Sequence, residues 1–300
     1  MKNKKLTVTI GIPAYNEERN IGRLLRTLVG QKEKGFRIQK IIVVSDASTD
    51  KTSQEVKKIR DKRVSLIENT VRIGQSASQN KLMKLCRDDI LVILEGDTLP
   101  ASQEYLMHLL ASFFSDNKTK LVQGKAVCAK PRTFIGKVYA RNYQALNETY
   151  ERNEKLQRKI CSGRGGRAFA RALYKKLHLP ISVPEDLYIL FWCRKQEMKV
   201  SYAKAALIYF QPSGTLFDLI KGERKISGGK NSLENHFGKQ AVQKHYEKNV
   251  VTYLCAFATQ SPFHFVSYLF LKGVVIIVAA NQEFTDFWSV SHSSKIVSTK

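Results

Sequence analysis

The chain has 300 residues, enough for one large domain or two modest ones with a sizeable core. Hydrophobic residues make up 43% of it, which excludes a disordered chain. Its 50 basic and 26 acidic residues leave a net charge of +24, which indicates a nucleic acid, an anionic membrane surface or a phosphate-bearing substrate as partner. The five cysteines form no CxxC pair, which favours reduced thiols over a disulfide framework or a zinc site.

Short β-rich runs alternate with helical patterns in the first part of the chain. This alternation predicts βαβ units and a parallel sheet, with ligands bound beyond the carboxyl ends of the strands. Asn16 is expected to cap the first helix and Pro100 to start the helix after the fourth strand. The predicted strands are 7–12, 40–44, 64–67 and 90–94, and a helix is predicted at 75–87.

The second part of the chain is less regular. A strand is expected at 121–129, a long helix at 134–158, and a glycine-rich turn that leads into a short strand and helix at 162–171. A helix that starts with two acids follows at 183–194, then a strand at 199–210 and a basic helix at 215–230 that ends in glycines. The whole pattern predicts one α/β unit over 1–230, with halves 1–120 and 121–230, and a helical region over 231–300.

Three polar clusters follow strands of the predicted parallel sheet: "PAYNEE" (13–18), "SDASTD" (45–50) and "EGD" (95–97). The topology places all three on one edge, which is therefore a predicted ligand-binding edge. Two carboxylates one residue apart, Glu95 and Asp97, could share Mg²⁺ or Mn²⁺ together with substrate phosphates. The alternative is a solvated turn whose acids only cap the next helix.

These clusters and "VPED" (183–186) occur in an order and spacing that resemble the family 2 nucleotide-sugar glycosyltransferases, over roughly residues 6–230. The resemblance implies a GT-A fold, Rossmann-like with a mostly parallel central sheet, and transfer of a sugar from a nucleoside-diphosphate donor. It also implies inversion at the sugar carbon and a divalent metal. A half that binds the nucleotide sugar would be followed by a half that binds the acceptor.

The resemblance also implies roles for individual residues. Asp186 matches the family's catalytic base, beside Glu185, and Glu95 and Asp97 match its metal-binding DxD, with Glu in place of the first Asp. Arg224 alone is retained from the QxxRW motif of processive members, in "KGERK" (221–225), and this departure from the motif favours a single transfer over polymer synthesis. Glu185 and Arg224 are expected to bind substrate. The residues matching the donor-binding motifs are Pro13, Tyr15, Glu17, Asp46 and Arg72, and Gly74, Gln75 and Asn80 fall in the segment that flanks the diphosphate.

The segment 263–281 is almost continuously apolar, broken by Lys272. It could be a single membrane span, an interfacial helix or a buried core helix. With no signal peptide at the amino end, we expect a protein at the cytoplasmic face of the cell membrane, attracted to anionic lipid.

The sequence therefore predicts a metal-dependent, inverting glycosyltransferase with a lipid-linked or glycan acceptor. A nucleotidyltransferase and a non-catalytic nucleic-acid-binding protein are the alternatives. Nucleic acid is the less favoured partner, because no compact stripe of interleaved basic and aromatic residues is present. The absence of HExxH and of a GxGxxG after the first strand argues against a zinc hydrolase and a dinucleotide oxidoreductase.

Overall fold

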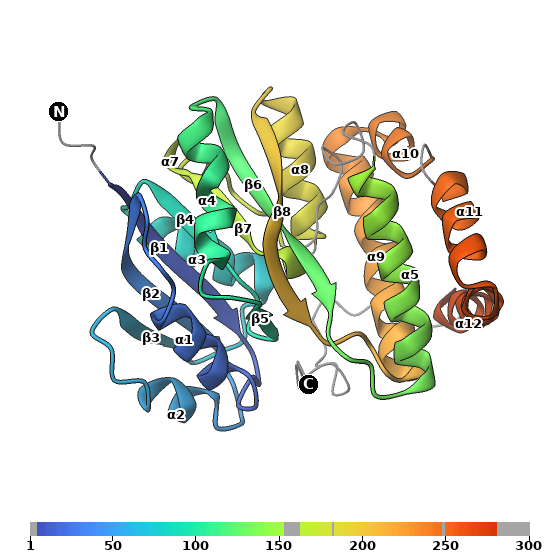
Figure 1. Cartoon of the computed structure of the whole chain (residues 1–300), viewed down its shortest axis with the longest axis horizontal. Coiled ribbons are helices and arrows are strands. Elements are labelled where there is room, and N and C mark those ends of the chain that lie inside the picture. Colours follow the sequence, from blue (N-terminus) through green and yellow to red (C-terminus); the bar gives the residue numbers. More distant parts are fainter. Residues whose placement is uncertain (1–4, 153–162, 182, 248–249, 281–300) are drawn as a thin grey trace.

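An eight-stranded mixed sheet forms the centre of the molecule, with strand order β3-β2-β1-β4-β7-β6-β8-β5 (Figure 1). The computed structural model describes residues 5–152, 163–181, 183–247 and 250–280. β1, β2, β3 and β4 are mutually parallel, as the sequence predicts, whereas β7 runs antiparallel to both β4 and β6. The strands are β1 (Leu6–Ala14), β2 (Phe36–Asp46), β3 (Val64–Asn69), β4 (Ile90–Ile93), β5 (Thr98–Pro100), β6 (Thr119–Cys128), β7 (Arg167–Ala170) and β8 (Lys199–Phe210).

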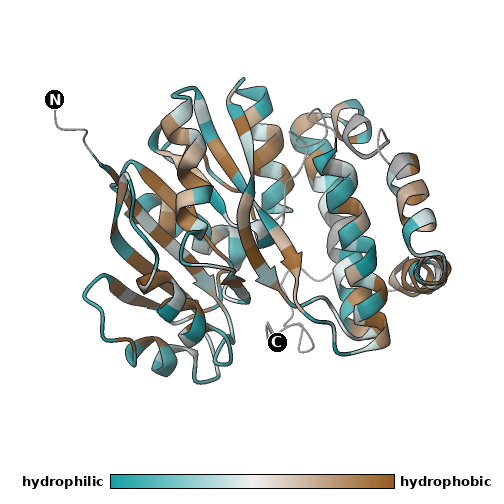
Figure 2. Ribbon diagram, in the orientation of Figure 1, coloured by the Kyte–Doolittle hydropathy of each residue, from teal (hydrophilic) through white to brown (hydrophobic). Residues whose placement is uncertain are grey.

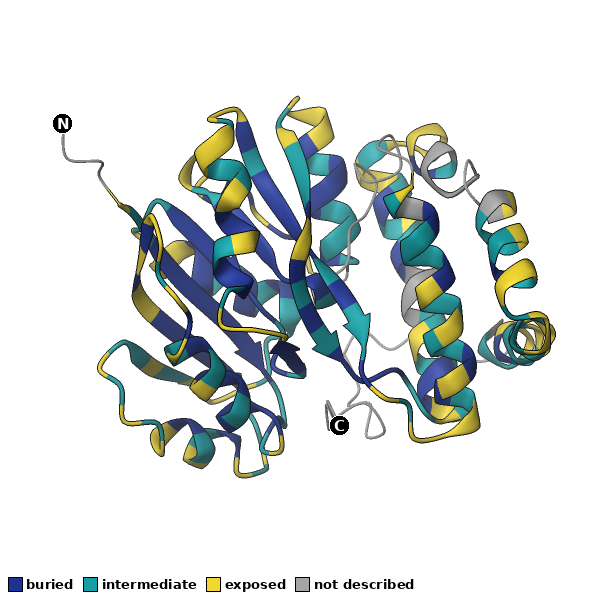
Figure 3. Cartoon of the chain, in the orientation of Figure 1, coloured by how far each residue is buried: buried dark blue, intermediate teal, exposed yellow. Residues whose placement is uncertain are grey.

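Helices cover both faces of this sheet, which gives the predicted α/β class. One hydrophobic cluster joins β1, β2 and β4 to α1 and α4, and another joins β4, β6 and β7 to α3, α7 and α8. The strands are the most deeply buried part of the molecule (Figure 3). The helices of this part are α1 (Ile21–Val29), α2 (Thr52–Lys57), α3 (Gln75–Leu85), α4 (Tyr105–Ser115), α7 (Arg171–Tyr174) and α8 (Glu185–Lys195).

The remaining helices lie beyond the β6–β8 side of the sheet (Figure 1). α12 packs against α5 and α9, and its ribbon is largely brown, the colour of hydrophobic residues, in Figure 2. The division expected at residue 230 falls inside α9, so one continuous helix joins the α/β unit to the C-terminal helices. These helices are α5 (Phe134–Glu151), α9 (Leu216–Phe237), α10 (Lys239–Glu247), α11 (Val250–Gln260) and α12 (Pro262–Ala280), and a short 3₁₀ turn, η1, spans Gly163–Gly165.

Three local predictions are wrong. Asn16 does not cap α1, because it has a φ of 55° and its side-chain oxygen accepts from the Thr49 amide; Asn20 holds the N-cap position instead. Pro100 ends the short strand β5, which pairs with β8, and α4 begins only at Tyr105. α9 continues past its glycines, since Gly229 lies so close to α8 that an added Cβ would be 2.6 Å from Pro184 Cγ.

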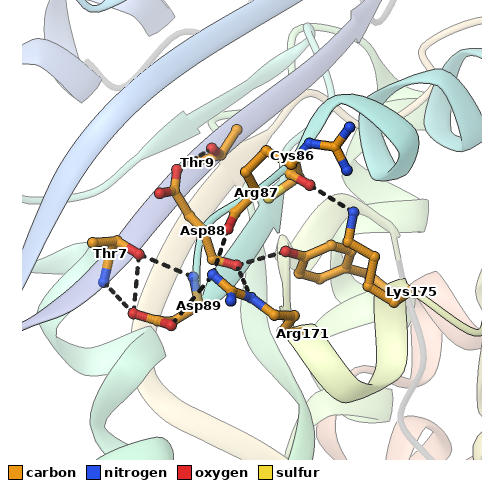
Figure 4. A network of polar contacts seen from close by, with 9 residues as sticks. Thr7, Thr9, Cys86, Arg87, Asp88, Asp89, Arg171 and Lys175 are labelled. Carbon is orange, nitrogen blue, oxygen red and sulfur yellow. Dashed lines mark hydrogen bonds and ion pairs between the residues drawn. The ribbon is translucent and has the colours of Figure 1, made fainter.

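A polar network fastens the amino ends of β1 and β4, at the edge opposite the three polar clusters (Figure 4). The amide and hydroxyl of Thr7 donate to Asp89 Oδ2 at 3.0 and 2.9 Å. Arg171 Nε of α7 donates to the Asp88 carbonyl at 3.1 Å, and Lys175 Nζ donates to the carbonyl of Cys86. These bonds join segments about eighty residues apart, so the network serves the fold and leaves the other edge for ligands.

Candidate active site

The first two polar clusters are tied together where β1 and β2 end. The Thr49 amide donates to Asn16 Oδ1 at 2.9 Å, and the Glu17 amide donates to Thr52 Oγ1 at 2.7 Å. The left-handed conformation of Asn16 turns the chain after β1 toward the second cluster. The prediction that these clusters share one edge is therefore confirmed.

Side chains predicted to bind the donor line this part of the edge. Arg72 stacks on Tyr15, with its guanidinium carbon 3.8 Å from the ring centroid, which is a favourable cation–π distance. Pro13 is buried in β1 opposite Val44, where a missing amide hydrogen is tolerated next to the strand's end. The Tyr15–Arg72 pair offers a flat, cationic surface of the kind that a nucleotide base and diphosphate can contact.

Asp46 holds the loop after β3. Its carboxylate accepts the amides of Ile73 and Gly74 at 2.9 and 2.8 Å and the side-chain amide of Asn69 at 2.9 Å. Gly74 has a φ of 86°, so this loop uses a conformation that favours glycine. Asp46 thus fixes the loop that carries Arg72, whether or not it also contacts a nucleotide base.

We expect Asp46→Asn to lower nucleoside-diphosphate affinity about tenfold, because one acceptor oxygen is replaced by a donor that faces backbone amides. Titration calorimetry with UDP and GDP measures this loss, and hydrogen exchange at Ile73 and Gly74 should accelerate. Asp116→Asn, which removes a surface ion pair with Lys199, is the control. Unchanged affinity together with unchanged exchange would remove Asp46 from the site.

The acid pair, Glu95 and Asp97, follows β4, and both of its carboxyl groups have raised pKa values. Burial, together with the negative charges of Asp97, Asp186 and Glu185, raises the pKa of Glu95 to about 8. Burial also raises the pKa of Asp97, while the charge of Arg164 opposes that rise. Glu95 and Asp97 therefore lie in a site that is short of positive charge.

Gly96 is required between these two acids by its contact with Glu17. A Cβ at position 96 would lie 2.7 Å from Glu17 Cγ, and Glu17 is buried. Glu17 Oε2 in turn accepts from the Asn20 side chain at 3.2 Å. The acid-glycine-acid spacing therefore lets the turn after β4 approach the loop after β1 closely.

The start of α8 brings the second pair of acids to the same place. Glu185 is fully buried and Asp186 is half-buried, and both charges act on Glu95. Pro184 precedes the helix and is held by the close approach of Gly229. A carboxylate near the acid pair yet partly exposed, as Asp186 is, can accept a proton from a bound hydroxyl.

One residue here was missed by the sequence reading. Arg164 lies in the turn η1, and the sequence points only to the glycines around it, Gly163, Gly165 and Gly166, which resemble either the acceptor-side loop of the family or an ordinary turn. Burial lowers its pKa, but the charges of Asp97 and Glu95 outweigh that effect and leave its pKa raised. Its guanidinium carbon lies 4.6 Å from the centroid of Phe210.

Two other predicted residues, Asn80 and Arg224, make no hydrogen bond or ion pair with these acids within the described part of the chain. Asn80 exchanges two hydrogen bonds with the backbone of Leu179, at 2.8 and 2.9 Å, so its amide is used to hold α3 to the loop before α8. Arg224 lies in α9, and among the described residues no hydrogen bond or ion pair joins it to Glu95 or Asp97. Its predicted role in substrate binding stays a prediction.

The residues present fit a divalent cation bound with substrate. Among the described residues no three His, Cys, Asp or Glu side chains gather as a complete ligand set. Mg²⁺ nevertheless needs only one or two carboxylates when phosphates and waters complete its shell. The electrostatic strain between Glu95 and Asp97 is what such a cation would relieve.

Residues 9–177 match the sequence profile described as "Glycosyl transferase family 2", which is more than half of the chain. The chain belongs to glycosyl transferase family 2. The enzyme class expected from the sequence, a glycosyltransferase, is thus confirmed.

Curated relatives of this glycosyltransferase are distant. Poly-beta-1,6-N-acetyl-D-glucosamine synthase of Staphylococcus aureus (strain COL) is 23% identical over 242 residues, which cover 77% of this chain and 56% of the relative. The Escherichia coli UDP-Glc:alpha-D-GlcNAc-diphosphoundecaprenol beta-1,3-glucosyltransferase WfaP is 29% identical over 113 residues, covering 36% of this chain and 44% of WfaP. The chain therefore spans about half the length of these relatives.

Solved structures share the fold of this glycosyltransferase. The mannosyltransferase PcManGT from Pyrobaculum calidifontis, in complex with GDP-Man and Mn²⁺, has a TM-score of 0.60 at 18% identity and covers 91% of this chain and 81% of its own. Glucosyl-3-phosphoglycerate synthase from Mycobacterium tuberculosis was solved with Mn²⁺, UDP and phosphoglyceric acid. It has a TM-score of 0.53 at 17% identity, and the match covers 78% of this chain and 79% of the synthase chain. The GT-A fold expected from the sequence is confirmed.

Proposed function

We propose that this glycosyltransferase moves a single sugar from a nucleoside-diphosphate sugar to a lipid-linked or glycan acceptor, with inversion. The observation that carries the proposal is the meeting of Glu95 and Asp97, at the end of β4, with Asp186, at the start of α8. An inverting transfer needs a group that takes the proton of the acceptor hydroxyl, and an acid pair can hold a divalent cation together with the donor phosphates. Family membership favours this function over nucleotidyl transfer and over nucleic-acid binding.

Each group has a defined task in this proposal. Tyr15 and Arg72 contact the nucleotide, and Glu95 and Asp97 hold Mn²⁺ or Mg²⁺ with the donor phosphates. The cation, when bound, neutralises charge on the departing diphosphate. Asp186 takes the proton from the acceptor hydroxyl as that oxygen attacks the sugar carbon. PcManGT and glucosyl-3-phosphoglycerate synthase were each solved with Mn²⁺ and a nucleotide ligand, GDP-Man and UDP respectively, which supports the proposal of a divalent cation and a nucleotide donor.

The test is release of nucleoside diphosphate from a panel of UDP-, GDP- and dTDP-sugars, with Mn²⁺, with Mg²⁺ and with EDTA. Adding a polyprenyl-phosphate-linked sugar should stimulate release from one donor, and mass spectrometry should find the acceptor heavier by one sugar. A ladder of longer products would contradict single transfer, and no release from any donor would contradict the proposal itself.

We further propose that α12 binds the cytoplasmic face of a membrane and lies in the plane of its surface. Within the described residues, Pro262–Ala279 is long and apolar enough to cross a bilayer, but it packs along α5 and α9. Only 6% of this segment is buried, so the buried-core alternative is wrong.

Contacts divide α12 into two sides. Tyr268 packs on Tyr139 of α5 with centroids 5.6 Å apart, Lys272 pairs with Glu223 of α9, and Val275 is buried. The exposed side includes Val266, Phe270 and Ile277, which helical geometry places on the opposite face. Phe263 is also exposed, although its ring contacts Phe134 of α5. The one charged residue of the segment thus faces the protein, and an apolar face is left for lipid.

The triple change Phe263→Ser, Phe270→Ser and Ile277→Ser should weaken binding to phosphatidylglycerol-containing vesicles more than about a hundredfold, since each apolar side chain contributes about 1.5–3 kcal/mol when fully buried. Vesicle sedimentation in 0.1 M and 1 M salt measures the loss of membrane binding. Ile181→Ser removes an exposed apolar side chain outside α12 and is the control. Binding by the triple variant that vanishes only in 1 M salt would assign membrane attachment to the basic surface instead.

A further inference from the structure

The turn η1 is shaped to deliver one side chain. An added Cβ on Gly165 would lie 2.2 Å from the Gly124 carbonyl oxygen, and one on Gly166 would lie 2.1 Å from the Tyr105 hydroxyl. Gly166 also has a φ of 71°, and its carbonyl accepts the Gly124 amide at 3.0 Å. Two glycines in succession therefore press this turn onto β6, and Arg164 is the residue that projects from it.

Further contacts fix the position of this arginine. The Tyr105 hydroxyl donates to the Gly165 carbonyl at 3.0 Å, in a buried setting, which anchors the turn from α4. The guanidinium of Arg164 stacks on Phe210, and Phe210 pairs with Thr98, the residue after Asp97. Arg164 is thus placed beside the turn that carries the acid pair.

Negative charges outnumber positive ones among the groups that act on Glu95. The negative charges of Asp97, Glu185 and Asp186 all act on Glu95, whereas the positive charge of Arg164 acts on both Glu95 and Asp97. Among the described residues, no direct ion pair joins Arg164 to either carboxylate of the acid pair. A planar guanidinium near two carboxylates, but not bonded to them, keeps its donors available for a phosphate.

We propose that Arg164 is a fixed cation of the donor site, which binds the diphosphate of the nucleotide and competes with a divalent cation for the acid pair when no nucleotide is bound. This inference rests on the proposed function, because it assigns the diphosphate to the neighbourhood of Glu95 and Asp97. In this proposal two positive charges face the diphosphate. Arg164 is a permanent one, and the divalent ion is an exchangeable one.

The proposal predicts two effects of Arg164→Gln with opposite signs. Affinity for UDP or GDP in EDTA should fall about 10- to 100-fold, as expected for loss of a hydrogen bond to a charged group, and by less in Mn²⁺. Affinity for Mn²⁺ alone should rise at least about threefold, because the acid pair loses a nearby positive charge. Titration calorimetry measures the first effect and electron paramagnetic resonance of Mn²⁺ the second.

Matched variants separate this role from a structural one. Arg164→Lys keeps the charge and should restore the Mn²⁺ affinity of the wild type, with part of the nucleotide affinity. Arg141→Gln removes an exposed positive charge from α5 and should change neither quantity. If Arg164→Gln weakens both ligands together, the turn is merely structural and the proposal is overturned; unchanged affinities overturn it as well. If the wild type binds neither UDP nor GDP under any condition, the proposed function itself fails.

Discussion

Asp97→Asn is expected to lower the transfer rate on the order of a thousandfold, because loss of a metal ligand removes several kcal/mol of transition-state stabilisation. Mn²⁺ affinity should fall in parallel, measured without nucleotide by electron paramagnetic resonance. Glu95→Gln should also lower the transfer rate and Mn²⁺ affinity, but by less, since Glu95 replaces the Asp usual at the first position of the family motif.

Asp97→Asn should leave the fold intact or stabilise it. Burial and mutual repulsion raise the pKa of Glu95 to about 8, so the acid pair destabilises the folded protein in the absence of a cation. Removing one charge is therefore expected to hold or raise the unfolding temperature. Asp50→Asn is the control at the same edge, because its carboxylate accepts from the Glu18 and Thr52 amides. An Asp97→Asn variant with full transfer and unaltered Mn²⁺ affinity would withdraw the metal assignment.

Asp186→Asn should slow transfer by about 10²–10⁴-fold, the usual effect of losing a general base. The substitution keeps the size of the side chain, so donor affinity should change little. Steady-state rates at saturating donor and acceptor measure the loss, and nucleotide titration checks the second expectation.

The neighbouring acid provides the matched variant. Glu185 is fully buried in the first turn of α8, so Glu185→Gln is expected to act on stability more than on rate. If Glu185→Gln costs more transfer than Asp186→Asn at equal stability, the base is Glu185. Full transfer by both variants would reduce the start of α8 to a structural element.

Elements with a strong local pattern could be predicted from the sequence. β1, β2 and β4 are apolar runs bounded by polar turns, and the parallel order follows from their alternation with helices. Asp97 and Asp186 are proposed as site residues because the motifs that contain them resemble those of the family. The meeting of the three polar clusters could be found because parallel strands end on one edge.

Features that depend on contacts between distant segments could not be predicted. The N-cap propensity of Asn16 is overridden by its bond to Thr49, and Pro100 belongs to a strand because β8 lies beside it. Arg164 carries no signal of its own, since its place depends on Gly124, Tyr105 and Phe210 from three other elements. Gly229 reads as a helix terminator until its contact with Pro184 is seen.

The strand order has a consequence for synthesis of the chain on the ribosome. β1 to β4 are complete once residue 93 has been made, but the second edge of β4 pairs with β7, which begins at Arg167. Because domains form as the chain emerges, at about 5–20 residues per second, this apolar edge stays open for several seconds at least. An unpaired strand edge is a site for pairing with other chains. Substitutions that delay docking of β7, such as those at Gly166, are therefore expected to lower the yield of soluble protein before they affect its final stability.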